Sequence, residues 1–147
     1  MNYLLDSNTI SDFYDKDSIN YPKILTKIAT LKSRDKVAIS ILTLYELEYG
    51  LANAPENRKP VIEQKIVEAE QDFFILPLSK QGAKIFGNFK KLIRENRILN
   101  KENIKKHNID LMIAATAIVE NYSLVSADSI YAEISGFDDR LKLEDWT

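Results

Sequence analysis

The chain has 147 residues, of which 45% are hydrophobic and 29% are charged, and this composition suits one folded domain over residues 1–147. Cysteine is absent, which excludes disulfide bonds, thiolate catalysis and zinc sites built from cysteine. The net charge of −2 by itself argues against a protein that binds nucleic acid.

Membrane insertion and secretion are also disfavoured. The best apolar stretch, residues 113–119, is far too short to span a bilayer. Asp6 interrupts the apolar start of the chain, so that a signal-peptide pattern is missing. We expect a soluble, cytoplasmic protein that has no membrane partner.

Apolar residues recur in patterns that predict strands alternating with helices. Short apolar runs predict the strands, and apolar residues three and four positions apart predict the helices. In chain order we expect a strand at 3–5, a helix at 9–14, a helix at 24–31, a strand at 37–39, a helix at 43–53, a helix at 61–71, a strand at 73–78, a long helix from 79 through 93, a helix at 109–121, a strand at 124–125 and a further strand at 141–143. Pro77 suits an edge strand or a strand end. The alternation predicts an α/β domain with a mostly parallel sheet, in which ligands bind beyond the carboxyl ends of the strands.

The usual ligand of such a fold is a nucleotide, but the motifs for nucleotide binding are missing. There are four glycines, and none lies in the turn between the first strand and the first helix. The only histidine, His107, has no G-x-S-x-G motif to support a serine triad, and in its basic loop it reads as a surface residue.

Positive charge is concentrated in one segment of an otherwise acidic chain. Residues 80–107 contain nine Lys and Arg against two Glu, a net charge of +7, whereas the whole chain carries −2. A solvated helix face and a surface for a polyanion both remain open. If the ligand is RNA, we expect contacts from Lys90, Lys91, Arg94, Arg97, Lys105 and Lys106.

Four acids lie at corresponding points of the predicted strands and helices. Asp6 and Asp128 follow strands, Glu46 lies in the first turn of the helix after the second strand, and Asp110 opens the helix that ends at residue 121. In a parallel sheet these positions meet at one edge, where uncompensated carboxylates would repel one another. A hard cation such as Mg²⁺ neutralises such a cluster and keeps waters and substrate phosphates among its ligands. This chemistry is that of metal-assisted phosphoryl transfer, with one metal or with two about 3.5–4 Å apart.

Each acid also has a purely structural interpretation. Asp6 and Asp110 suit helix N-caps, and Asp128 suits a turn. Glu46 lies three residues after Thr43, as in a capping box. Helical periodicity does not choose between Glu46 and Glu48 as the functional glutamate.

Five stretches of the sequence resemble one known family. They are YLLDSNTIS with Asp6, AISILTLYELEYG with Glu46, NIDLMIAATAI with Asp110, LVSADSIYAEI with Asp128, and the closing LKLEDW. Together they resemble the PIN-domain ribonucleases, specifically the VapC toxins of bacterial and archaeal toxin–antitoxin pairs. The resemblance implies a three-layer α/β/α domain with a short, mostly parallel sheet, and a Mg²⁺-dependent endoribonuclease in which Mn²⁺ can substitute.

The resemblance also implies a role for individual residues. Asp6 and Asp110 would be the main metal ligands, Glu46 would complete the site directly or through water, and Asp128 would hold a second metal or its water. The resemblance thus selects Glu46 over Glu48. Ser7, Asn8 and Ser126 match small polar positions beside these acids. The implied partners are an RNA substrate, a cognate antitoxin that covers the acidic pocket, and a second copy of the chain in a homodimer.

Two other functions stay open on the sequence alone. The chain can be a PIN-like module that binds RNA or protein without cutting, or a metal-dependent phosphatase of small substrates. The intact set of four acids argues against the first, and the basic segment argues against the second.

Overall fold

Five short strands form one parallel sheet in the computed structural model of the chain, which describes residues 1–96 and 105–147. The strands lie in the order β3-β2-β1-β4-β5. Their bounds are β1 Asn2–Leu5, β2 Lys36–Ser40, β3 Phe74–Leu76, β4 Ser123–Val125 and β5 Leu143–Glu144. The prediction of an α/β domain with a mostly parallel sheet is therefore confirmed.

The three central strands end within one residue of one another. Leu5, the last residue of β1, pairs with Ile39 on one side and with Val125 on the other. The residues that follow these strands therefore leave the sheet at the same edge, its carboxyl edge.

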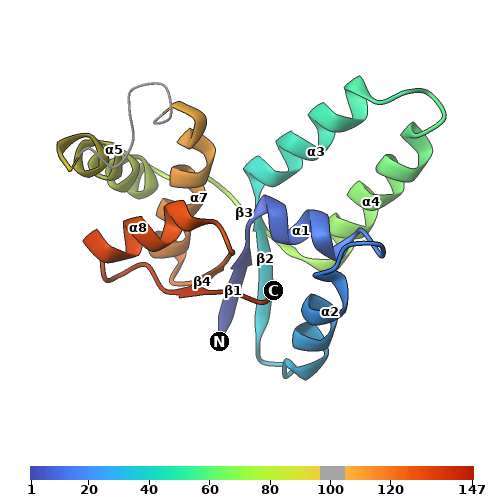
Figure 1. Cartoon of the computed structure of the whole chain (residues 1–147), viewed down its shortest axis with the longest axis horizontal. Coiled ribbons are helices and arrows are strands. Elements are labelled where there is room, and N and C mark those ends of the chain that lie inside the picture. The colour runs from blue at the N-terminus through green and yellow to red at the C-terminus, as the bar shows by residue number, and fades with distance from the viewer. Residues whose placement is uncertain (97–104) are drawn as a thin grey trace.

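Helices cover both faces of the sheet, which gives the expected α/β/α layers (Figure 1). One layer contains α5 (Lys80–Glu95), α7 (Asn108–Glu120) and α8 (Ser129–Phe137). The other contains α1 (Ser7–Phe13), α2 (Tyr21–Thr30), α3 (Ile41–Asn53) and α4 (Lys59–Asp72). Because α7 runs back toward the start of β4, its first turn lies at the carboxyl edge of the sheet (Figure 1).

Successive residues of each strand enter different cores. Leu4 packs in the core with α5, α7 and α8, whereas Leu5 packs in the core with α1, α2 and α4. In the same way, Leu124 packs in the first of these cores and Val125 packs in the second. This alternation is the two-residue period of a strand, and burial on both faces explains why the strands read as short, wholly apolar runs.

Several element boundaries differ from the predicted ones. Helix α3 begins at Ile41 rather than at residue 43, because Ser40 caps it by accepting a hydrogen bond from the Leu42 amide. Helix α7 runs from Asn108 to Glu120, and the left-handed backbone of Asn121 (φ 58°) stops it. β5 lies at Leu143–Glu144 instead of 141–143. Pro77 follows the edge strand β3, as expected. Across residues 1–96 and 105–147 no helix combines the length and the apolar character needed to cross a bilayer.

Candidate functional site

Asp6 is a buried acid placed directly after the central strand. Its side chain is 3% exposed, and its Oδ1 accepts a hydrogen bond from the Thr9 amide at 2.8 Å, so it is also the N-cap of α1. Its Oδ2 accepts a hydrogen bond from Ser126 at 2.5 Å. Burial raises the pKa of Asp6 above its ordinary value, and the charge of Asp110 raises it further, while the hydrogen bonds from Ser126 and Thr9 oppose the rise.

Ser126 links Asp6 to the loop that carries Asp128. The Ser126 hydroxyl donates to Asp6 and accepts from the Asp128 amide at 3.0 Å. Asp128 is the N-cap of α8, where its Oδ1 accepts a hydrogen bond from the Ile130 amide at 3.1 Å. One serine thus holds two acids that lie 122 positions apart in the sequence.

Asp110 lies in the first turn of α7 and is held by two side chains. Its Oδ2 is 2.9 Å from Nδ1 of His107, and its Oδ1 accepts a hydrogen bond from the hydroxyl of Tyr131 at 3.3 Å. The capping interpretation of Asp110 is wrong, because the helix begins two residues earlier, with His107 at the N-cap position.

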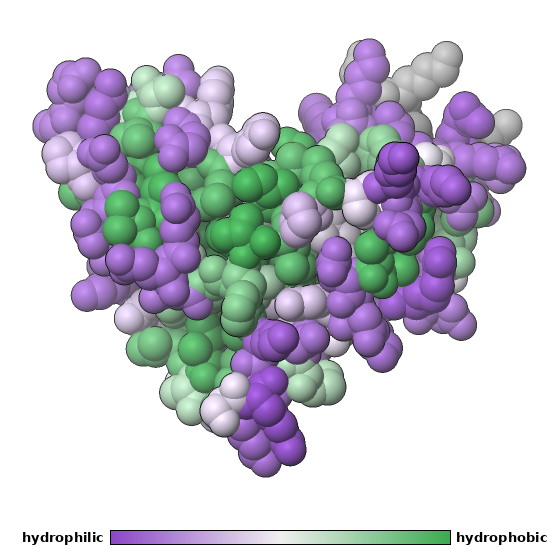
Figure 2. Space-filling view, turned by 180° about the vertical axis from the view of Figure 1, so that it is seen from behind, coloured by the Kyte–Doolittle hydropathy of each residue, from purple (hydrophilic) through white to green (hydrophobic). Residues whose placement is uncertain are grey.

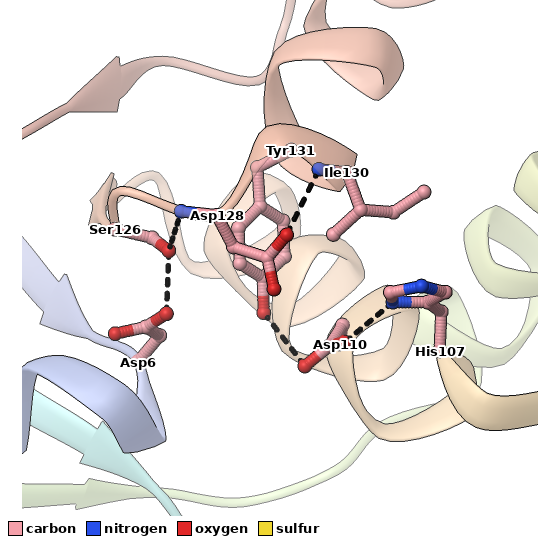
Figure 3. A network of polar contacts seen from close by, with 7 residues as sticks. All are labelled: Asp6, His107, Asp110, Ser126, Asp128, Ile130 and Tyr131. Carbon is pink, nitrogen blue, oxygen red and sulfur yellow. Dashed lines mark hydrogen bonds and ion pairs between the residues drawn. The ribbon is translucent and has the colours of Figure 1, made fainter. Parts of the chain in front are cut away.

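The acids from three elements face one region of the carboxyl edge. Figure 3 shows Asp6 after β1, Asp110 on α7 and Asp128 before α8 grouped around the hydroxyl of Tyr131. One ligand atom each from His107, Asp110 and Asp128 lies within 4.8 Å of the others, so these three form the one group among the described residues that could jointly hold a cation, and Asp6 is not a member of it. Carboxylate oxygens are the ligands that a hard divalent cation prefers, and the two carboxylates of this group fit such a cation.

His107 was not expected at this site. The sequence places it in a basic loop and favours a surface residue, yet its side chain is only 25% exposed and contacts Asp110. The spacing i, i+3 puts both residues on one side of the first turn of α7. If the predicted helix had been extended toward its N-terminus to include residue 107, the i, i+3 spacing would have placed His107 beside Asp110.

Glu46 reaches the site from α3 through Ser7. Its Oε1 accepts a hydrogen bond from the Ser7 hydroxyl at 2.5 Å, and that hydroxyl is also 3.2 Å from Oγ1 of Thr43. The capping-box interpretation of Glu46 is wrong, because Thr43 lies inside the helix that Ser40 caps. Glu46 is exposed and is not a member of the group formed by His107, Asp110 and Asp128.

The remaining predicted positions that the structure describes lie at or near the surface. Asn8, on the first turn of α1, is exposed. Lys91 and Arg94 are exposed on α5, while Lys90 is half-buried with its ammonium group 5.6 Å from the ring centre of Phe86. Lys105 and Lys106 are exposed, and Arg97 lies outside the described residues.

Comparisons with known proteins agree with this architecture. The PIN domain family matches residues 3–136. No curated protein matches the chain significantly. The chain is similar to a chain of VapBC2 from Rickettsia felis, crystallised with a DNA fragment from their promoter, at 25% identity and a TM-score of 0.76 over 100% of both chains.

Two further solved structures share the fold. One is VapBC-1 from nontypeable Haemophilus influenzae, with 21% identity, a TM-score of 0.78 and coverage of 99% of this chain and 98% of that one. The other is FitAcB from Neisseria gonorrhoeae, with 21% identity, a TM-score of 0.75 and coverage of 98% and 97%. These matches confirm the resemblance to VapC-type PIN proteins, and the chain belongs to the PIN-domain family.

Proposed function

We propose that this chain, as one PIN domain over residues 1–147, is a metal-dependent endoribonuclease. The observation that carries the proposal is the approach of Asp6, Asp110 and Asp128 from three separate elements to one edge of the sheet. Such a cluster is costly without a cation, since each charge disfavours ionisation of the others. The family match supports a nuclease on independent grounds.

Mg²⁺ is the cation we propose, with Mn²⁺ as a substitute. Asp6 and Asp110 would be the main ligands, Asp128 would hold the metal or a bound water, and Glu46 would close the site from the side of α3. The bound cation would supply positive charge for the scissile phosphate and a water of lowered pKa. The protein fixes its ligands beforehand: Ser126 holds Asp6, and Ser7 holds Glu46.

RNA is the polyanion that we assign to the basic surface. Lys91 and Arg94 on α5, with Lys105 and Lys106 before α7, present exposed positive charge on the side of the sheet that also carries Asp110. We add the half-buried Lys90 to these four as a fifth proposed RNA contact. Arg97 is assigned to the same surface by its sequence position alone. Phosphate contacts of this kind give affinity without choosing the sequence that is cut.

Within the cell we assign the chain the role of the toxin in a type II toxin–antitoxin pair. Structures that share its fold are VapBC complexes, one of them bound to promoter DNA. The proposed partner is a cognate antitoxin that covers the acidic edge, and the proposed setting is the cytoplasm, where RNA is the substrate.

A homodimer is the second assembly that we propose. Figure 2 shows apolar residues gathered across the middle of one face, between two hydrophilic lobes. Exposed apolar side chains include Phe74 on the edge strand β3 and Leu78 just after it. Apolar surface of this kind is typical of contacts between subunits.

The test is cleavage of total RNA by the purified protein in Mg²⁺, in EDTA, and by Asp6→Asn. Asparagine keeps a side-chain oxygen for the Thr9 amide, so the variant is expected to fold. We expect cleavage by the wild type in Mg²⁺ alone. Undiminished cleavage by Asp6→Asn would overturn the assignment, and faster hydrolysis of a small phosphate ester than of RNA would favour the phosphatase.

The alternative is a PIN-like module that binds RNA or protein without cutting. It predicts RNA binding that is unchanged by Asp6→Asn and no binding of Mg²⁺ or Mn²⁺ by calorimetry. The convergence of three carboxylates, which such a module does not need, favours the nuclease.

A further inference from the structure

Asp110 is held in a different way from the other two acids of the cluster. Asp6 and Asp128 each cap a helix and accept a hydrogen bond from a backbone amide. The carboxylate of Asp110 is held by side chains, with His107 on Oδ2 and Tyr131 on Oδ1. Backbone amides are fixed by the helix itself, whereas the direction of Asp110 depends on two residues that mutation can remove singly.

The contact with His107 fixes both partners. Carboxylate oxygens accept hydrogen bonds, and Nδ1 of His107 lies 2.9 Å from Oδ2 of Asp110, in place to donate an N–H to it. His107 lies at the N-cap position of α7 and Asp110 in its first turn, which brings the ring beside the carboxylate (Figure 3). Chemically, this pair is a histidine that orients a neighbouring acid.

Tyr131 brings its hydroxyl to the same carboxylate from the hydrophobic core. Its side chain is fully buried among residues of α5, α7 and α8, where the ring of a phenylalanine would fill almost the same volume. Its hydroxyl lies beside Asp110, with Asp6 and Asp128 close by (Figure 3). The buried ring is fixed by the core around it, so that its hydroxyl points at Oδ1 of Asp110 as a hydrogen-bond donor.

We propose that His107 and Tyr131 are positioning residues for Asp110, which hold its two oxygens so that their free lone pairs face the cation. The inference rests on the proposed function, because it assigns the pair to the same metal site. It differs from a purely structural role in one measurable respect. Loss of either donor should weaken metal binding more than it weakens the fold, because the helix and the core remain in place.

The experiment is calorimetric titration of Mn²⁺ into the metal-free protein, with the thermal midpoint measured alongside. Tyr131→Phe removes only the hydroxyl, and His107→Ala removes the imidazole. His107→Asn is the rescue variant, since its side-chain amide can place an N–H where Nδ1 lies. Tyr122→Phe is the matched control, because Tyr122 follows the far end of α7.

We expect Tyr131→Phe and His107→Ala each to bind Mn²⁺ about 10-fold more weakly, or worse, as for other residues that orient metal ligands. His107→Asn and Tyr122→Phe should stay close to the wild type. Unchanged affinity in His107→Ala or in Tyr131→Phe overturns the assignment of that residue while the nuclease proposal stands. Absence of Mn²⁺ and Mg²⁺ binding by the wild type overturns both.

Discussion

The hydroxyl of Ser7 donates a hydrogen bond to Oε1 of Glu46 over 2.5 Å, joining the first residue of α1 to the middle of α3. Ser7 directly follows the buried Asp6. Two neighbouring residues thus supply one acid of the site and a hydrogen bond to a second acid, Glu46, 39 positions after Ser7. The same hydroxyl lies near Thr43, one turn earlier on α3. Glu46 is therefore the glutamate of α3 that is tied to the acidic edge.

This contact predicts that Glu46 and Glu48 differ in function although both are exposed on α3. Glu46→Gln should lower the rate of RNA cleavage by about 10-fold or more, because it removes the charge beside the metal site. Glu48→Gln makes the same chemical change two residues away and should cleave at the wild-type rate. Equal rates for the two variants would contradict the role of Glu46.

We expect the Asp6 carboxylate to lower the stability of the metal-free fold while it serves the metal site. Because burial raises its pKa, ionised Asp6 destabilises the metal-free fold at neutral pH. Asp6→Asn keeps the N-cap and removes this charge, so its melting temperature at pH 7 should be higher, by about 2–4 °C for each 1 kcal/mol relieved. Differential scanning calorimetry of the metal-free proteins checks the direction.

Two controls separate this effect from a general change in the fold. A carboxyl with a raised pKa takes up its proton as the pH falls, so the advantage of Asp6→Asn should shrink on going from pH 7 to pH 5. Millimolar Mg²⁺ should raise the melting temperature of the wild type more than that of the variant. A destabilised Asp6→Asn protein would show that the native carboxylate is satisfied without a cation.

The basic surface should bind RNA through phosphate contacts. Lys90→Gln, Lys91→Gln and Arg94→Gln, combined in the cleavage-deficient Asp6→Asn background, should weaken RNA binding and reduce the salt dependence. Three lost contacts to single-stranded RNA correspond to a change of about 2 in the slope of log affinity against log salt. Fluorescence anisotropy over a series of salt concentrations measures that slope.

A matched triple variant removes the same charges elsewhere. Lys23, Lys32 and Arg34 are exposed on α2 and the loop that follows it. Their replacement by glutamine should leave the slope unchanged. Equal losses in the two triple variants would mean that net charge, and not this surface, governs binding.

Asp138 and Arg140 provide a pH test away from the site. Hydrogen bonds from the Arg140 side chain, at 2.9 and 2.6 Å, lower the pKa of Asp138. A carboxyl whose pKa is lower in the folded state stabilises the fold above its unfolded pKa, near 4, and this stabilisation is lost as the pH falls through the folded pKa. Because Arg140 is half exposed, Asp138→Asn should cost about 0.5–1 kcal/mol at pH 7.

Urea denaturation at pH 7 and at pH 3 measures both differences. The gap between the wild type and Asp138→Asn should narrow at the lower pH. A constant gap would mean that Asp138 acts through its shape at the end of α8, and not through its charge.

The sequence predicted the sheet well because its strands are buried on both faces. Leu4 and Leu124 face one core, and Leu5 and Val125 face the other, so each run is wholly apolar and easily recognised. Helix starts were harder to predict. Strand β2 passes into α3 without a loop, and only the polar Ser40, which caps the helix, separates Ile39 from the apolar Ile41 and Leu42.

The site itself depends on contacts that spacing does not encode. Asp6 and Ser126 are 120 positions apart and meet because β1 pairs with β4. The resemblance to VapC toxins named Ser126 and chose Glu46, but periodicity alone did neither. The place of His107 in the site was not predicted, because the predicted helix began at residue 109 and its i, i+3 relationship to Asp110 was therefore not considered.

We propose above all that the acids at the carboxyl edge form one metal-dependent site that cuts RNA. The most direct measurement is the initial rate of RNA cleavage in Mg²⁺ by Asp110→Asn beside Asp139→Asn, since Asp139 is an exposed acid after α8. We predict a loss of at least about 100-fold for Asp110→Asn and wild-type activity for Asp139→Asn. Cleavage by Asp110→Asn at the wild-type rate, with its fold intact, would contradict the account.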